Sequence, residues 1–255
     1  MSRQPEGPPP PPVVQRLRVR YAKRGRLRFT SHRDFARAFE RALRRGEVPM
    51  AYSAGFSPHP KVSYAGAAPT GVASEAEYLE IGLAEERDPE AVRTALDQAL
   101  PPGLDIVEVV AGGPPPLAER IEASHWRIEL PGVTADEARA AAGALLAAAE
   151  APVDKITKDG RRTVDARAPI VLMRVSSAPD PSDAGACAII DVVVRHATPT
   201  VRPDDVLTAL RQVGALSTPV TPFVTRLAQG LLGAPPPVDD EPITLVDPLR
   251  EVVEP

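Results

Sequence analysis

The chain has 255 residues, of which 43% are hydrophobic, 25% are charged and 4% are aromatic, and its formal net charge is -4. This balance predicts a folded chain with one large core or two small ones, and it excludes a protein that is basic over its whole length. The single cysteine, Cys187, excludes an intrachain disulfide and a cysteine-based zinc or iron–sulfur centre.

Membrane and cofactor signals are missing from the sequence. No apolar run reaches the roughly 18 residues that a membrane span needs, and no apolar signal core follows the first residues. We therefore expect a cytoplasmic protein that has no membrane partner. No glycine-rich phosphate loop, serine elbow or paired-carboxylate motif is present, so we expect no cofactor and no metal. The oligomeric state stays open.

The first half of the chain predicts one folded unit. Residues 1–14 include the proline run 8–12 and are expected to be a disordered leader. Residues 15–112 follow the order strand, helix, strand, strand, helix, strand. The first helix covers 31–45, with the hydroxyl of Ser31 as its N-cap. The other elements are strands at 16–21, 62–65, 77–83 and 104–110 and a helix over 88–100.

The second half repeats a similar order. Residues 113–120 are expected to be a linker, residues 121–232 a second α+β unit, and residues 233–255 a flexible acidic tail. The second unit has predicted strands at 122–130, 188–195 and 222–227, helices over 134–150 and 202–213, and a hairpin over 153–165 that turns at Asp159-Gly160. An apolar stretch at 169–175 precedes a polar loop at 176–185. The predicted fold class is α+β, with two ferredoxin-like βαββαβ units packed together, each an antiparallel sheet with helices on one face.

The first helix has two chemically different sides. At 100° per residue its apolar residues form one sector and its arginines the other, within about 80° of one another. The predicted core sector is Phe35, Phe39, Ala42 and Leu43, and the predicted basic sector is Arg33, Arg37, Arg41 and Arg44, with Arg45 at its edge. A charged stripe is most often only a solvated face. Like charges at i,i+4 repel, however, so arginines without interspersed acids favour an anionic partner.

Charge is also concentrated around this helix. Residues 16–45 hold twelve basic and two acidic residues, a local net charge of +10. We expect the first strand to add arginines on one sheet face, and acids of the third strand to pair with them. The hairpin is a second basic candidate. These sets are Arg16, Arg18 and Arg20; Glu75, Glu77 and Glu80; and Lys155, Lys158, Arg161 and Arg162.

Aromatic residues on the central strands are few. The first and third strands offer only Tyr21 and Tyr78, and no aromatic-rich third-strand motif is present. The commonest RNA-binding modules of this fold stack bases on such aromatics. Any RNA contact is therefore expected to be directed at phosphates.

Two histidines flank the basic helix. His32 follows the N-cap, where the helix dipole favours a bound anion. His59 lies between Pro58 and Pro60, which hold the backbone extended, and precedes Lys61. Each histidine has a purely structural alternative. If both meet in one cleft, metal-free RNA cleavage becomes conceivable, with one histidine as base and the other as acid. His125 and His196 are expected to be structural.

Three long segments resemble a known family. Residues 23–35 (KRGRLRFTSHRDF), 37–45 (RAFERALRR) and 49–61 (PMAYSAGFSPHPK) resemble the radical-SAM-linked domain of unknown function, and residues 164–167 resemble a further element of it. In that family the domain is a stand-alone protein or a C-terminal extension of a B12-type radical SAM protein. A radical SAM core needs three cysteines, and this chain has one. The resemblance therefore implies a partner or substrate-presenting role in a stand-alone form.

Together these patterns predict a non-catalytic binding module for structured RNA or another polyanion. The alternative is a protein–protein adaptor for a radical SAM or RNA-modifying enzyme, and the last-ranked hypothesis is a metal-free RNA-processing enzyme that uses His32 and His59. The predicted anion contacts are Arg33, Arg37, Arg41, Arg44, Arg45, His59, Lys61, Arg161 and Arg162.

Overall fold

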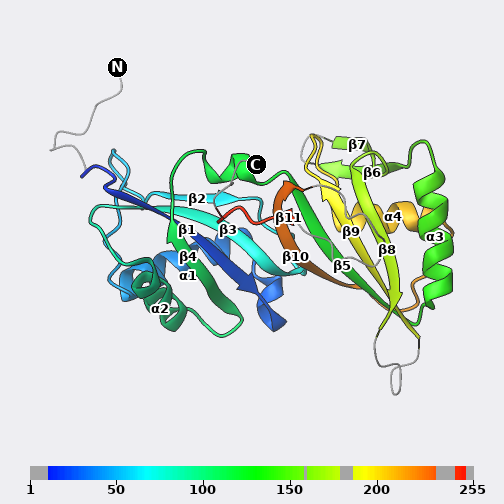
Figure 1. The fold of residues 1–255 in the computed structure, drawn as a ribbon, viewed down its shortest axis with the longest axis horizontal. Helices are drawn as coiled ribbons and strands as arrows, with labels where there is room; N and C mark the ends of the chain where they lie inside the picture. The colour runs from blue at the N-terminus through cyan, green and yellow to red at the C-terminus, as the bar shows by residue number, and fades with distance from the viewer. Residues whose placement is uncertain (1–10, 158–159, 179–185, 234–244, 251–255) are drawn as a thin grey trace. The chain divides into compact units, whose positions relative to one another are not determined.

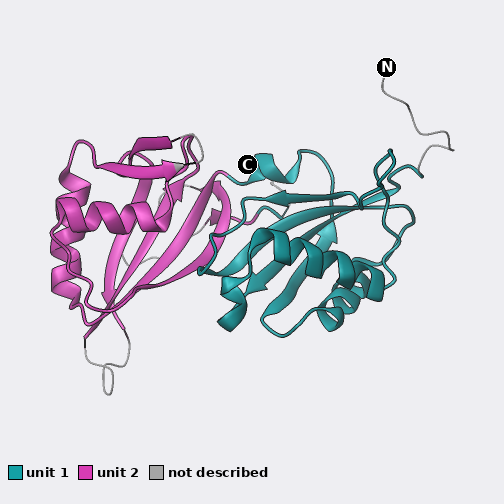
Figure 2. Cartoon of the chain, turned by 180° about the vertical axis from the view of Figure 1, so that it is seen from behind, with its two compact units in different colours: residues 1–121, 248–255 teal, residues 122–247 magenta. Residues whose placement is uncertain are grey.

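The computed structural model describes residues 11–157, 160–178, 186–233 and 245–250. It divides into two compact units, residues 1–121 with 248–255 (unit 1) and residues 122–247 (unit 2), which Figure 2 colours separately. The predicted leader up to residue 10, the turn residues Lys158 and Asp159, and most of the predicted tail lie outside the described residues.

Unit 1 is built on an antiparallel sheet. Its strand order is β4-β1-β3-β2, because β1 pairs with both β3 and β4, and β2 pairs with the other side of β3. Its elements, shown in Figure 1, are β1 (Gln15–Lys23), a 3-10 helix (Gly25–Phe29), α1 (His32–Arg45), β2 (Val62–Ala65), β3 (Ala73–Leu83), α2 (Pro89–Ala99), β4 (Leu104–Ala111) and a second 3-10 helix (Leu117–Arg120).

Helix α1 forms as its sequence predicts. The Oγ of Ser31 accepts a hydrogen bond from the Asp34 N–H at 3.2 Å, which satisfies a free amide of the first turn. The N–H of Gly46 closes the last turn on the Ala42 carbonyl. The predicted core sector is confirmed, since Phe35, Phe39, Ala42 and Leu43 are the buried residues of the helix.

The core of unit 1 joins both helices to one face of the sheet. Leu17, Val19 and Tyr21 alternate along β1 and belong to the same buried cluster as Phe39 of α1 and Leu96 of α2. The Tyr21 and Phe35 rings also stack, with their centroids 4.1 Å apart.

The opposite face of the unit 1 sheet is covered as well. Tyr78 belongs to a second buried cluster with Leu117 and Leu249. The second half of the predicted linker 113–120 forms the 3-10 helix Leu117–Arg120, whose Leu117 packs into this unit. Within the predicted tail 233–255, Leu245 and Val246 pair with a strand and Leu249 is buried.

Unit 2 has an antiparallel sheet in the order β10-β5-β9-β8, with β11 on the outer side of β10 and β6–β7 as a separate hairpin. Helix α3 packs on β8 and β9, and α4 packs on α3. The elements are β5 (Ala123–Pro131), α3 (Ala135–Ala147), β6 (Pro152–Thr157), β7 (Gly160–Asp165), β8 (Ile170–Ser177), β9 (Cys187–Arg195), α4 (Pro203–Val213), β10 (Phe223–Leu232) and β11 (Leu245–Val246).

Two glycines of unit 2 provide opposite tests of this packing. Gly143 is exposed on helix α3, where an added Cβ meets no atom within 4 Å, whereas a Cβ on Gly214 lies 2.6 Å from the Cα of Ala141. We expect Gly143→Ala to stabilise unit 2 by about 0.5–1 kcal/mol through helix propensity, and Gly214→Ala to destabilise it by about 1–3 kcal/mol through overpacking. Urea unfolding followed by the fluorescence of Trp126, the one tryptophan, measures both changes. If both variants change the free energy of unfolding in the same direction, the described packing of α3 and α4 is contradicted.

Acid stability of unit 2 depends on Asp191. Burial acts to raise its carboxyl pKa, but hydrogen bonds from His125 and Arg127 outweigh burial and hold that pKa below its ordinary value. The ionised carboxylate therefore stabilises unit 2 at pH values above the ordinary aspartate pKa of about 3.9. This stabilisation is lost as the pH falls below that value and then below the lower pKa of Asp191 in the folded state.

We expect Asp191→Asn to be less stable than the wild type at neutral pH and to lose less stability on acidification from about pH 5 to about pH 3. Trp126 fluorescence in urea at a series of pH values measures this slope. The control is Asp136→Asn, because the Asp136 side chain is 93% exposed. This variant should keep the wild-type slope of stability against pH. A wild-type slope in Asp191→Asn contradicts the prediction.

Candidate functional site: a basic helix face and the pocket beside it

The five predicted arginines of α1 are all exposed. They lie on the solvent side because the opposite side of the helix is anchored in the core. Arg44 pairs with Glu40 one turn earlier, at 3.8 Å between Nη2 and Oε2, and its Nε donates to the Glu40 carbonyl at 3.3 Å. Among the described residues the other four form no ion pair; they are Arg33, Arg37, Arg41 and Arg45.

This basic helix face, the five arginines together, holds like charges at close spacing. Four of them recur every fourth residue, so neighbouring guanidinium groups repel by a few tenths of a kcal/mol each. The helix has two acids, and one of them, Asp34, accepts a hydrogen bond from the Ser31 hydroxyl at 2.6 Å. The positive potential of the face is therefore little compensated by α1 itself, and an anion placed there relieves the repulsion.

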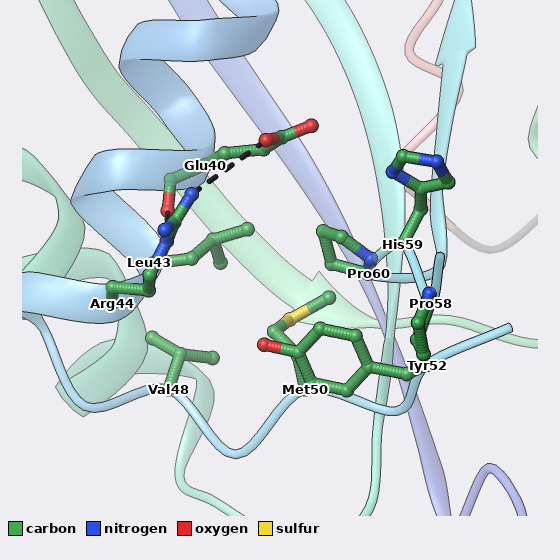
Figure 3. A pocket seen from close by; sticks show the side chains of 9 residues that line it. All are labelled: Glu40, Leu43, Arg44, Val48, Met50, Tyr52, Pro58, His59 and Pro60. Carbon is green, nitrogen blue, oxygen red and sulfur yellow. Dashed lines mark hydrogen bonds and ion pairs between the residues drawn. The ribbon is translucent and has the colours of Figure 1, made fainter. Parts of the chain in front are cut away.

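A pocket of about 280 Å³ lies beside the C-terminal half of α1. In Figure 3 the helix side chains occupy one wall and the proline–histidine segment faces them. The turn after α1 and the chain leading into the loop complete the lining. The lining residues are Glu40, Leu43 and Arg44 from α1, Val48, Met50 and Tyr52 after it, and Pro58, His59 and Pro60 opposite.

The loop that carries His59 is closed by backbone contacts. Tyr52 and Pro60 form an isolated antiparallel bridge. The Ser53 N–H donates to the His59 carbonyl at 2.8 Å, and the His59 N–H donates to Ser53 Oγ at 3.1 Å. The Lys61 N–H continues the pairing to the Ala51 carbonyl at 2.8 Å. The imidazole of His59 is thus held at the pocket by a fixed backbone and is exposed to solvent.

The second histidine of the sequence hypothesis occupies a different place. His32 is exposed at the start of α1, and its ring meets the ring of Tyr64 edge-on, with centroids 4.7 Å apart and an interplanar angle of 89°. It is not among the residues that line the pocket of His59. Burial and the nearby charge of Glu40 raise the pKa of Tyr64 to about 12, so this hydroxyl stays protonated.

Two of the three β1 arginines named in the sequence analysis share one carboxylate of β3. Arg18 is buried, donates to the carbonyls of Gly113 and Pro115, and pairs with Glu80 at 3.4 Å. Arg16 pairs with the same carboxylate at 3.3 Å. A buried charge is stable only when it is paired in this way, so Arg18 serves the fold. The predicted pairing of these arginines with acids of the third strand is confirmed for Glu80.

The other predicted acids have different partners. The guanidinium of Arg24, one residue after β1, pairs with both Glu75 and Asp105. The buried carboxylate of Glu77 accepts a hydrogen bond from the Ala68 N–H at 3.0 Å. These contacts fix loops against the sheet of unit 1.

The basic hairpin lies in unit 2. Arg161 and Arg162 are exposed on β7, and Arg161 is 3.6 Å from the Asp154 carboxylate of the neighbouring strand. Lys155, which the sequence suggested as a further anion contact, is only 2.6 Å from the carboxylate of the buried residue Asp205. Its charge is therefore used inside unit 2.

Residues 164–167 form a structural turn. The Asp165 carboxylate accepts hydrogen bonds from the N–H groups of Ala151, Arg167 and Ala168, at 2.8, 2.9 and 3.3 Å. The Arg167 guanidinium donates to the Leu146 carbonyl at 3.1 Å. This segment therefore fastens the end of β7 to the last turn of α3 and to Ala151 after it.

Sequence reasoning missed most of the pocket. Leu43 was assigned to the core alone, and Val48, Met50 and Tyr52 were assigned no role. Met50 reaches its position through an isolated bridge to Leu83 of β3, a contact between residues far apart in the chain. The density of aromatic, methionine and proline residues over 49–60 was the one local signal.

Two further features are absent from the described part of the chain. No group of three or more His, Cys, Asp or Glu side chains there is arranged to hold a metal ion. None of its helices combines the length and apolar character needed to cross a membrane.

Comparisons with known proteins place the chain in a family without a known activity. No curated protein matches the sequence. Among 26 matching solved chains, an unknown protein from Galdieria sulphuraria is 16% identical, with 83% of this chain and 98% of that chain covered and a TM-score of 0.24. A chain of a Cbf5-Nop10-Gar1 complex is 10% identical, with 89% and 55% covered and a TM-score of 0.43.

With TM-scores below 0.5, neither structure carries an argument about function. The family model described as "Uncharacterized protein conserved in bacteria (DUF2344)" matches residues 16–203, which is most of the chain. The chain therefore belongs to this DUF2344 family.

Proposed function

We propose that this chain is a cytoplasmic, non-catalytic module that binds structured RNA through the basic helix face. The observation that carries the proposal is the exposure of all five arginines on one side of α1, four of them without an ion pair among the described residues. Guanidinium groups bind phosphate oxygens through two parallel hydrogen bonds, which suits them to a phosphate backbone.

The length of the face favours a polymer over a small anion. Arg33 and Arg45 are twelve residues apart, which corresponds to about 18 Å along a helix axis. One phosphate occupies a small part of that distance, whereas successive phosphates of a nucleic acid follow it. The rest of the chain carries the compensating negative charge, since residues 16–45 have a net charge of +10 and the whole chain -4. This asymmetry orients an approaching polyanion towards α1.

The sheet of unit 1 supports a phosphate-directed mode. Tyr21 and Tyr78, the two aromatic residues on its central strands, are each only 3% exposed and are committed to buried clusters. They are not available to stack bases as the sheet aromatics of the common RNA-binding modules do. His59, which lines the pocket beside α1, and Lys61 are exposed and are proposed as additional phosphate contacts, as are Arg161 and Arg162 of unit 2.

We also propose that the two units are copies of one ferredoxin-like fold. Without the β6–β7 hairpin, unit 2 has the chain order β5, α3, β8, β9, α4, β10. This matches the order β1, α1, β2, β3, α2, β4 of unit 1. The order of the unit 2 strands in the sheet, β10-β5-β9-β8, then corresponds to β4-β1-β3-β2 of unit 1. The hairpin is an insertion between the first helix and the second strand of the repeat.

The proposal predicts a charge-dependent affinity that is specific to α1. We expect the Arg37→Glu, Arg41→Glu double variant to bind structured RNA at least about tenfold more weakly, and to reduce the slope of log K against log salt concentration by about 2, because two phosphate contacts are lost. Fluorescence anisotropy with a labelled hairpin RNA over a series of salt concentrations measures both values.

The matched control changes the net charge equally at other surfaces. Arg87→Glu with Arg139→Glu replaces two arginines that are about half exposed and lie outside α1. This control should keep nearly the wild-type affinity. Equal weakening of the two double variants indicates a nonspecific charge effect, and unchanged binding by the α1 variant overturns the proposal.

A second candidate function is an adaptor for a radical SAM or RNA-modifying enzyme. It is favoured by two exposed aromatic rings of unit 1, Phe29 at 58% and Phe56 at 76% exposure, since exposed aromatics commonly anchor protein partners. The resemblance of the sequence to the radical-SAM-linked domain suggests that the partner is a radical SAM protein.

A pull-down with the tagged full chain separates the two functions. If the chain is an adaptor, a protein partner stays bound after nuclease treatment, and Phe56→Ala weakens its capture. If the chain binds RNA, nuclease releases the captured material, and Phe56→Ala has little effect.

A further inference from the structure

The pocket beside α1 combines an apolar floor with a charged rim. Leu43 and Met50 are buried core residues whose side chains nevertheless border the cavity, and Val48 is partly buried against the same core. Arg44 and His59 are exposed at the cavity. Figure 3 shows these two side chains on opposite walls. A ligand that fits this lining has an apolar body and an anionic group that stays outside.

The size of the cavity limits that body to about one ring system. A volume of about 280 Å³ is at the lower end of the range for small-molecule pockets. The ring of Tyr52, 39% exposed, lines the cavity and offers a face for stacking. Stacking on an aromatic side chain accepts any nucleobase, since every base has a π-face.

The charges of the helix wall decide which end of a nucleotide enters. The Glu40 carboxylate lines the cavity and repels a phosphate, whereas it accepts hydrogen bonds from the N–H groups of a base. Arg44 lines the same cavity and is also a member of the basic helix face. A backbone phosphate outside the pocket is therefore directed to the arginines, while the base points inward.

We infer that the pocket binds a single unstacked nucleobase of the RNA whose phosphates lie along α1. This inference rests on the proposed function and adds to it a base-reading site. It explains how a module whose sheet aromatics are buried can still distinguish an RNA with an unpaired base from a continuous duplex. Single-stranded loops and bulges supply such bases.

Methyl NMR provides a direct test, because the chain has three methionines and one of them lines the pocket. In the full chain labelled with 13C at the methionine methyl groups, we expect ribonucleoside 5′-monophosphates to shift the Met50 signal through the ring current of the bound base. Ribose 5-phosphate, which has no base, should leave it unchanged. Met173, buried in β8 of unit 2, is the internal control.

Variants of Tyr52 test the same site with RNA. We expect Tyr52→Ala to bind a hairpin RNA with an unpaired loop base at least about fivefold more weakly, as base–aromatic stacking implies. The loss should vanish when that nucleotide is abasic. Tyr52→Phe, which keeps the ring, should retain wild-type affinity. Phe56→Ala is the matched control, since Phe56 lies in the same loop and does not line the pocket.

The outcomes separate this inference from the proposed function. RNA binding that depends on Arg37 and Arg41 while Met50 does not respond to nucleotides overturns the base pocket and keeps the RNA-binding module. If nucleotides shift the Met50 methyl signal but the chain does not bind RNA, the pocket is a nucleotide site and the proposed RNA-binding module is overturned. Equal Met50 shifts with ribose 5-phosphate and with nucleotides overturn the inference, because the pocket then recognises the phosphate.

Discussion

The arrangement of unit 1 depends on the anchoring of one side of helix α1. Phe35 and Phe39 are buried, and Phe35 stacks on Tyr21 of the central strand β1. This contact sets the rotation of the helix about its axis, because turning it by a quarter would expose two large aromatic rings and bury guanidinium groups. The direction of the arginines, the position of Arg44 at the pocket and the potential of the surface all follow from that apolar contact.

Much of the fold could be predicted because its determinants are local. Ser31 and Asp88 begin helices as N-caps, and the alternation of Leu17 and Val19 with arginines marks a strand with two different faces. The basic and apolar sides of α1 could be read from the 3.6-residue period alone. The length of β3 could not be predicted in this way. The strand begins at Ala73, before the predicted start at residue 77, because its first residues also pair with β1.

The parts that could not be predicted depend on contacts between distant residues. The position of Arg18 in the alternating pattern of β1 predicts an exposed side chain. In the structure its guanidinium is buried and donates to the carbonyls of Gly113 and Pro115, about 95 residues later in the chain. The bridge of Met50 to Leu83 brings an apolar floor to the basic helix, so the cavity has no signature in any single window. The role of Lys155 could not be predicted either, because the sequence shows its charge without the Asp205 carboxylate that the fold places beside it.

The choice of arginine for the α1 surface has a consequence for regulation. Guanidinium groups keep their charge at every pH at which proteins fold, unlike histidine and unlike lysine in a buried setting. The proposed attraction of this face for a polyanion therefore depends on charges that are open to the surrounding solvent. Dissolved ions and competing polyanions are what alter it, since they act within a Debye length of about 8 Å at physiological ionic strength. The proposed binding at this face therefore depends on the ionic composition of the surroundings.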